Sequence, residues 1–148
     1  MSDSNKIRVI LADDKEIIRQ GIRAILTRTD EIQLVGEAAD GEEAVALVAK
    51  LSPEIALIDI EMPCVDGIDA AKAIQKNFQK VSVIFLSCYA DRGFIHVLDE
   101  MGFSNYIIKD EAIKTLIPTI LVVAAKIQKL AEKIELSPPP VYVFSTNQ

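Results

Sequence analysis

The sequence predicts an α/β fold, a doubly wound parallel sheet of five strands that alternate with five helices, (βα)5. Two observations predict it. Short apolar runs alternate with amphipathic stretches along the chain, and continuously apolar runs are typical of strands that helices cover on both faces. The connections between the runs have the length of one helix, which favours right-handed crossovers. The runs occupy residues 9–12, 55–58 and 83–86, with a shorter one at 107–108.

A fifth strand is predicted over residues 32–39, where Gln33, Gly36 and Glu37 interrupt the apolar residues. Such a mixed pattern is typical of a strand with one edge or face less buried. Between the strands, apolar residues recur at helical spacing in three sets: Ile18, Ile22, Ile25 and Leu26; Ala44, Leu47, Val48 and Leu51; Phe94, Val97, Leu98 and Met101.

Start and stop signals delimit the helix at residues 44–51 and mark the beginning of a further one. Asp40 followed by Glu43 is typical of an N-cap with its capping box. Asp66-Gly67 begins another helix, and Ser52-Pro53 ends one.

A last helix is predicted from beyond Lys109 to about Leu136, with Pro118 in its first turn, where the missing N–H costs little. Ser137 and the three prolines after it end this helix. We therefore predict one folded domain over residues 1–136 and a Pro-rich linker or tail over residues 137–148.

Charge and hydropathy exclude several classes of protein. The 148 residues carry 16 Lys and Arg against 22 Asp and Glu, a formal net charge of −6, so the chain alone is not expected to bind nucleic acid. No signal-peptide core follows Met1, and the longest apolar stretch, residues 116–125, is about half a membrane span. We predict a cytoplasmic protein without a membrane segment.

Cysteine and histidine point to no metal site. Cys64 and Cys88 lie far apart and form no Cys-x-x-Cys pair, so buried, reduced thiols are expected. His96 has no partner at ligand spacing and is expected on the surface.

Three carboxylates follow predicted strands. Asp13 and Asp14 come after residues 9–12, and Asp59 comes after residues 55–58. The carboxyl ends of neighbouring strands meet at one crevice of such a sheet. Like charges brought together there favour a divalent cation, and Mg²⁺ fits best because it prefers oxygen ligands.

Lys109 ends the predicted last strand, residues 105–108, and would place a positive charge in the same crevice. A carboxylate nucleophile, Mg²⁺ and a lysine are the groups needed to form an aspartyl phosphate. Asp59, on the central strand, is the best nucleophile candidate, and Ser87 adds a hydroxyl donor.

At these residues the sequence resembles the receiver domain of two-component response regulators, over residues 7 to about 136. The resemblance implies a flavodoxin-like fold with strand order 2-1-3-4-5 and an extended last helix. The motifs that carry it are Leu-Ala-Asp13-Asp14, Leu-Ile-Asp59-Ile-Glu61-Met62-Pro63 with Asp66-Gly67, Phe-Leu-Ser87, and Tyr106-Ile-Ile-Lys109-Asp110.

The resemblance also implies a role for each site residue. Asp59 would be the phosphoacceptor, with a sensor histidine kinase as donor. Mg²⁺ would bind Asp13, Asp14, Asp59 and the main-chain carbonyl of Glu61. In the same way Ser87 would bond the phosphoryl group, Lys109 would neutralise it, and Tyr106 would change rotamer when Ser87 moves. The domain would be a signalling phosphoacceptor, an enzyme only toward its own phosphoryl group.

Two segments resemble the NarL/LuxR-type subfamily, which carries a helix-turn-helix: Lys109-Asp110, where many receivers have Lys-Pro, and residues 35–41. No helix-turn-helix follows Pro140, so DNA binding and transcription control would need a further C-terminal domain, unless the receiver acts alone. Cys88 stands where a small residue is more usual, which bears on the rate of dephosphorylation.

Three other functions are compatible with parts of this pattern. A Mg²⁺-dependent phosphohydrolase is disfavoured because Asp59-Ile60-Glu61 lacks the Asp-x-Asp pattern and no cap insertion is present. A flavin-binding protein is disfavoured because two acids follow the first strand, where a phosphate cradle is needed. A phosphorylation-independent interaction module stays open, although the complete acceptor set argues against it.

The last helix carries an apolar stripe with the 3, 4, 3, 4 spacing of heptad a and d positions: Ile120, Val123, Ile127, Leu130 and Ile134. Its first half is expected to pack on the sheet. Beyond Lys126 the stripe is predicted to be exposed, for a helical contact in a phosphorylation-linked homodimer or for contact with a partner domain.

Overall fold

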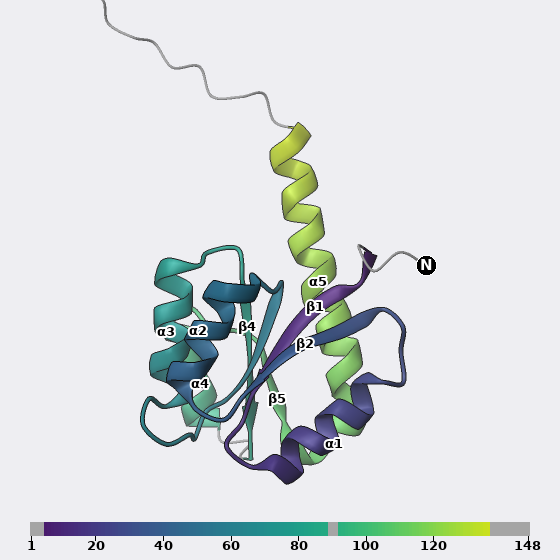
Figure 1. Ribbon diagram of the computed structural model, residues 1–148. Helices are drawn as coiled ribbons and strands as arrows, with labels where there is room; N and C mark the ends of the chain where they lie inside the picture. The colour runs from purple at the N-terminus through teal and green to yellow at the C-terminus, as the bar shows by residue number, and fades with distance from the viewer. Residues whose placement is uncertain (1–4, 89–91, 137–148) are drawn as a thin grey trace, which may run out of the picture.

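The structure is a computed structural model that describes residues 5–88 and 92–136 (Figure 1). Strands and helices alternate as predicted, and a short 3-10 turn, Lys109–Glu111, leads into the last helix. The strands are β1 (Ile7–Ala12), β2 (Ile32–Ala38), β3 (Ile55–Asp59), β4 (Ser82–Ser87) and β5 (Tyr106–Ile108). The helices are α1 (Glu16–Leu26), α2 (Gly41–Leu51), α3 (Gly67–Asn77), α4 (Arg92–Glu100) and α5 (Ala112–Leu136).

All five strands are parallel and lie in the order β2-β1-β3-β4-β5, which confirms the predicted topology. Figure 1 shows α1 and α5 on one face of the sheet and α2, α3 and α4 on the other. The central strand β3 is buried along its whole length. Its carboxyl end therefore lies between β1 and β4, where neighbouring strands can add side chains to a common site.

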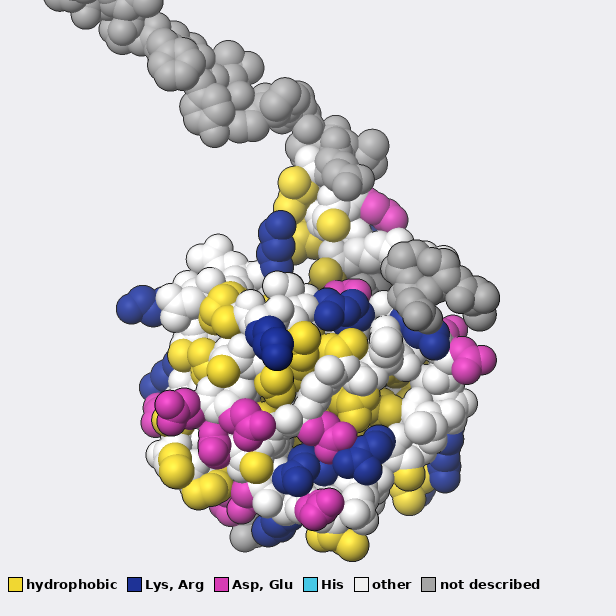
Figure 2. All heavy atoms as spheres, in the orientation of Figure 1, with side chains coloured by type: hydrophobic (Ala, Val, Ile, Leu, Met, Phe, Trp, Pro, Cys, Tyr) yellow, Lys and Arg dark blue, Asp and Glu magenta, His cyan; other side chains and the backbone are white. Residues whose placement is uncertain are grey.

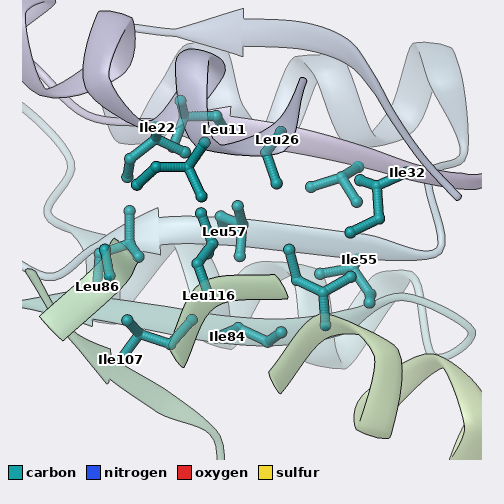
Figure 3. Packing of buried hydrophobic residues seen from close by; sticks show 14 of the residues in the cluster. Leu11, Ile22, Leu26, Ile32, Ile55, Leu57, Ile84, Leu86, Ile107 and Leu116 are labelled. Carbon is teal, nitrogen blue, oxygen red and sulfur yellow. The ribbon is translucent and has the colours of Figure 1, made fainter. Parts of the chain in front are cut away.

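The continuous apolar runs are explained by two hydrophobic cores, one on each face of the sheet. Leu57 packs with Ile22 of α1 and Leu116 of α5 (Figure 3), whereas the next residue, Ile58, packs in the core that α2, α3 and α4 cover. Successive side chains of a strand point to opposite faces, so a strand covered on both faces needs apolar residues at every position.

The predicted helix signals act as expected. Asp40 caps α2 by accepting the N–H of Glu43 at 2.8 Å, and the Glu43 carboxylate accepts the N–H of Ala39 at 3.1 Å. Asp66 caps α3 in the same manner, and Ser52 ends α2 in the left-handed region with φ 47°.

Two expectations about α5 and the cysteines are wrong. Pro118 lies inside α5, beyond its first turn, because the helix begins at Ala112 directly after the 3-10 turn. The buried side chains of Ala112 and Leu116 hold this early start against the sheet. Cys64 and Cys88 are free and exposed rather than buried, since they lie in the loops that follow the carboxyl ends of β3 and β4.

His96 is exposed on α4, as expected, with Nε2 3.1 Å from the Glu100 carboxylate one turn later. The expected tail, residues 137–148, lies outside the described residues. Within the described part of the chain, no helix is long and apolar enough to cross a membrane.

Candidate functional site

Three strands bring the predicted site residues together at the carboxyl edge of the sheet. Asp13 follows β1, Asp59 is the last residue of β3, and Lys109 follows β5. Ala12 and Ile58 are register partners in neighbouring strands, so the residues that follow them, Asp13 and Asp59, lie side by side. The structure thus places these three residues together at one edge of the sheet.

Lys109 bridges the two aspartates. Its Nζ lies 2.8 Å from Asp13 Oδ2 and 3.2 Å from Asp59 Oδ1. All three side chains are enclosed: Asp13 is fully buried and Asp59 is 4% exposed, while the Lys109 side chain is 8% exposed. Two carboxylates at this depth need a cation, and Lys109 supplies one positive charge for two negative ones.

Main-chain groups orient the carboxylates. Asp13 Oδ1 accepts the N–H of Lys15 at 2.9 Å, and Asp59 Oδ1 accepts the N–H of Glu61 at 3.3 Å. Asp13 Oδ2 has no hydrogen bond of good geometry to any described residue, so its contact with Lys109 is ionic. This buried oxygen keeps lone pairs that a metal ion could use.

The charges of the site change its proton affinities. Burial raises the pKa of Asp59, and the nearby charge of Asp13 raises it further against the opposing effect of Lys109. Burial by itself would lower the pKa of Lys109, but its contacts with Asp13 and Asp59 outweigh burial and raise it. The site thus has excess negative charge and a lysine held firmly in its protonated form.

The residues present fit a hard divalent cation. Oxygen atoms of Asp13, Asp14 and Asp59 lie within 4.8 Å of one another. Asp14 is exposed and lines, with Glu61, a groove of about 570 Å³ that opens beside the buried pair. Buried carboxylates, an exposed one and an open groove together suit Mg²⁺, which keeps several water ligands.

Ser87 and Tyr106 lie on the neighbouring strands. Ser87 is 6% exposed at the carboxyl end of β4, where its register partner in β5 is Ile108. Tyr106 begins β5 opposite Phe85 and packs, partly buried, against the core under α4. Ser87 therefore lies on the strand next to Asp59, whereas Tyr106 lies one strand further away, and the roles implied for them are taken up as proposals below.

The sequence analysis missed Arg19. Its Nη1 donates to the main-chain oxygen of Asp13 at 2.6 Å, and its Nε lies 3.5 Å from Glu37 of β2. The sequence offered a signal for this contact, a basic residue one turn into the first helix. Side chains of a helix point back toward its N-terminus, so this residue could be expected to reach the loop that precedes the helix. Arg19 thereby ties the loop that carries Asp13 and Asp14 to α1.

Comparison with known proteins gives a consistent result. Residues 9–121 match the family model described as "Response regulator receiver domain". The chain is 37% identical over 123 residues to transcriptional regulatory protein DegU of Brevibacillus brevis, a match that covers 82% of this chain and 52% of DegU. It is 34% identical over 128 residues to transcriptional regulatory protein LiaR of Bacillus subtilis, with 86% and 61% covered.

A solved structure supports the same relationship. The signal receiver domain of the response regulator NarL from Mycobacterium tuberculosis has a TM-score of 0.73 and 27% sequence identity. The similarity covers 84% of this chain and 98% of that one. The chain spans 52% of the length of DegU and 61% of the length of LiaR.

Proposed function

Because the chain belongs to the response regulator receiver family, which acts in two-component signalling and has NarL/LuxR-type regulators among its matched members, we propose that Asp59 accepts a phosphoryl group from a sensor histidine kinase. The observation that carries the proposal is the setting of Asp59. It is a buried carboxylate at the end of the central strand, 3.2 Å from Lys109 Nζ and beside two further aspartates.

In the proposed transfer, a carboxylate oxygen of Asp59 forms a bond to phosphorus as the bond from phosphorus to the donor's imidazole nitrogen breaks. The electron pair of that bond stays on the nitrogen, which then takes a proton from water. Lys109, already within 3.2 Å of Asp59, would neutralise one negative charge of the new phosphoryl group. The loose transition state asks mainly for such positioning and neutralisation.

Mg²⁺ would be held by the carboxylates of Asp13, Asp14 and Asp59 and by the main-chain carbonyl of Glu61. The buried Oδ2 of Asp13, without a hydrogen bond to any described residue, supports this assignment. Bound there, Mg²⁺ would supply charge neutralisation at the phosphoryl oxygens. The protein's own part is to hold oxygens of the three aspartates within 4.8 Å of one another before the ion arrives.

The new charge would act on the side of the sheet formed by α4, β5 and α5. Ser87 would donate to a phosphoryl oxygen, and Tyr106 would change rotamer in response. The altered face would then control association with a second copy or, in a longer cytoplasmic protein, with a domain that regulates transcription. The chain would work as a signalling acceptor that turns over only its own phosphoryl group.

The experiment is intact-mass measurement of the chain incubated with acetyl phosphate, with and without Mg²⁺. We expect one added phosphoryl group that requires Mg²⁺ and is absent in Asp59→Asn. Asp69→Asn, which alters an exposed aspartate of α3, is the matched control and should be phosphorylated like the unchanged protein.

Phosphorylation of Asp59→Asn to the same extent would place the acceptor elsewhere. No phosphorylation with any small phosphodonor, while the protein stays folded, would instead favour the phosphorylation-independent interaction module.

A further inference from the structure

The last helix continues well past the body of the protein. Figure 1 shows the end of α5 standing clear of the sheet and of the other helices, at the edge opposite to Asp59. We call residues 127–136 the α5 extension. It is about 15 Å long at 1.5 Å per residue.

The apolar stripe of α5 runs without a break from the core onto this extension. Ile120 and Val123 are buried against the sheet, and Ile127 is partly buried beside them. The next two members, Leu130 and Ile134, are 61% and 67% exposed. Figure 2 shows hydrophobic side chains on the part of the helix that rises above the body. A short helix is marginal in water, so an uncovered apolar face on its end favours a packing partner.

We propose that a second copy of this chain covers the exposed stripe, with the two α5 extensions antiparallel. The direction follows from sterics. Below Ile127 the same stripe faces the protein's own sheet, so a parallel partner helix on that side would run into the sheet. An antiparallel partner enters from beyond Leu136, and its own body then lies past the tip of the first helix.

The antiparallel pair covers the stripe completely and symmetrically. With Leu130 of each copy at the two-fold axis, Ile127 of the first copy meets Ile134 of the second. By symmetry, Ile134 of the first copy meets Ile127 of the second. Such an interface is isologous, because one patch pairs with itself and the assembly closes at two copies. The 3, 4 spacing of the stripe lets these side chains interdigitate as they do in a coiled coil.

The tip of each extension would also reach the body of the other copy. Two grooves flank Ile127, of about 690 Å³ and about 540 Å³, and Glu54 lines both. In the antiparallel arrangement Lys133 arrives at the level of Ile127 in the other copy, next to this carboxylate. Lys76 and Lys80 also line the larger groove, and Lys6 with Glu31 the smaller one, so the surroundings of the tip carry charges of both signs.

The expected dimer is weak. A two-helix contact about 15 Å long buries less than the roughly 1,200–2,000 Å² of a standard stable interface, even with the tips seated in the grooves. Association should therefore depend on protein concentration, which makes the proposal easy to test by titration.

Sedimentation velocity of the full chain over a range of concentrations gives the dimer dissociation constant. Leu130→Lys should raise it by at least about tenfold, since both copies lose a buried leucine at the axis. Val122→Lys is the matched control: Val122 is 54% exposed on the same helix but lies off the stripe, so its change should leave the constant unaltered. A chain that is monomeric at every concentration, or equal effects of the two substitutions, would overturn the proposal.

Disulfide trapping tests the direction of the helices. In a Cys64→Ser, Cys88→Ser background, Leu130→Cys should form a cross-linked dimer on mild oxidation, because the two thiols meet at the axis. Ile134→Cys should not, since its two copies lie on opposite sides of that axis. Efficient cross-linking through position 134 would show a parallel pair and contradict the inference.

Neither measurement uses phosphate, so the dimer and the phosphoacceptor role can fail separately. Asp59→Asn should dimerise like the unchanged chain in the absence of phosphodonor. Leu130→Lys should still be phosphorylated on Asp59.

Discussion

Asp13 is the residue on which most of the site's contacts converge. Its carboxylate meets Lys109 and the N–H of Lys15, and its main-chain oxygen accepts from Arg19. The Asp59 carboxylate, by contrast, has one ionic contact and one long hydrogen bond from a main-chain N–H among the described residues. A nucleophile must be free to leave its partners, whereas a metal ligand is better held in place, and this difference supports the roles proposed for the two residues.

Removal of Lys109 should destabilise the protein. In Lys109→Met two buried carboxylates face each other without a cation, which we expect to lower the free energy of unfolding by about 3 kcal/mol. Mg²⁺ should restore more stability to the variant than to the unchanged chain, because the ion would then supply the missing positive charge. Urea unfolding with and without Mg²⁺ measures both effects.

Lys114→Met, at an exposed position of α5, controls for loss of a lysine and should leave stability nearly unchanged. If Lys109→Met were as stable as this control, the buried pair would not depend on Lys109.

At the scale of elements, close approach of the α3 N-terminus to the end of β3 holds the loop that follows Asp59. The N–H of Gly67 donates to the carbonyl of Ile60 at 2.9 Å, and a Cβ at position 67 would collide with the main-chain oxygen of Asp59. Glycine is required here because of space, not because of its backbone angles.

Gly67→Ala should therefore destabilise the protein by about 1–3 kcal/mol and displace the Asp59 loop. The comparison is Gly21→Ala in α1, where an added Cβ meets nothing within 4 Å and helix propensity should stabilise by about 0.5–1 kcal/mol. Thermal unfolding and the extent of phosphorylation of both variants check this. Equal behaviour of the two would contradict the proposed tight contact.

The contact between α1 and β2 should make stability depend on pH. Both Arg23 nitrogens that face Glu37 lie 2.8 Å from its carboxylate oxygens, and this hydrogen-bonded pair lowers the pKa of Glu37 below 4.5. A carboxyl group with a lowered folded-state pKa stabilises the protein fully above its unfolded-state pKa. That stabilisation is lost as the pH falls through the folded-state value.

Comparison of Glu37→Gln with the unchanged chain isolates this contribution. Near neutral pH the variant should be the less stable of the two, by a small amount because Glu37 is 27% exposed. The difference should vanish below the folded-state pKa of Glu37, where both chains carry an uncharged group. Chemical denaturation at several pH values measures it, and a difference that grew toward acid would have the wrong sign.

At the scale of the whole molecule, α5 links two distant edges of the sheet. It begins just after Lys109, beside the proposed acceptor, and ends in the α5 extension at the opposite edge. Its first half packs in the core through Leu116 and Ile120, so a single helix connects the proposed acceptor with the α5 extension.

Phosphorylation should accordingly change the dimer dissociation constant, and we expect it to tighten the dimer. Linkage is reciprocal, so phosphorylation of Asp59 should become more extensive as protein concentration rises. In Leu130→Lys this concentration dependence should disappear. Sedimentation with beryllofluoride, a mimic of the phosphoryl group, tests the effect of phosphorylation on the dimer. Mass spectra over a concentration series test the effect of the dimer on phosphorylation. An unchanged dimer dissociation constant would show that the α5 extension does not respond to phosphorylation of Asp59.

The order of the elements along the chain and the three-strand origin of the site could be read from local patterns, whereas the strand order in the sheet was implied by the family resemblance. Continuous apolar runs, helix caps such as Asp40, and acids placed directly after strands depend on residues close in sequence. The exposed half of the α5 stripe was predictable for the same reason, because the apolar spacing continues beyond the part of the helix that packs on the sheet. Periodicity and capping are properties of neighbouring residues, so they can be recognised without knowledge of distant contacts.

Details that depend on distant contacts could not be read in this way. The position of Pro118 within α5, the exposure of Cys64 and Cys88, and the reach of Arg19 to Asp13 were set by how finished elements pack. The same holds for the shared contact of Lys109 with two buried aspartates and for the need for glycine at position 67. Burial and the choice of partners arise only when segments far apart in sequence meet. The sequence by itself therefore determined the elements and the proximity of the acidic residues. Only the tertiary structure decided how deeply these residues are buried, which partners they contact and how their pKa values shift.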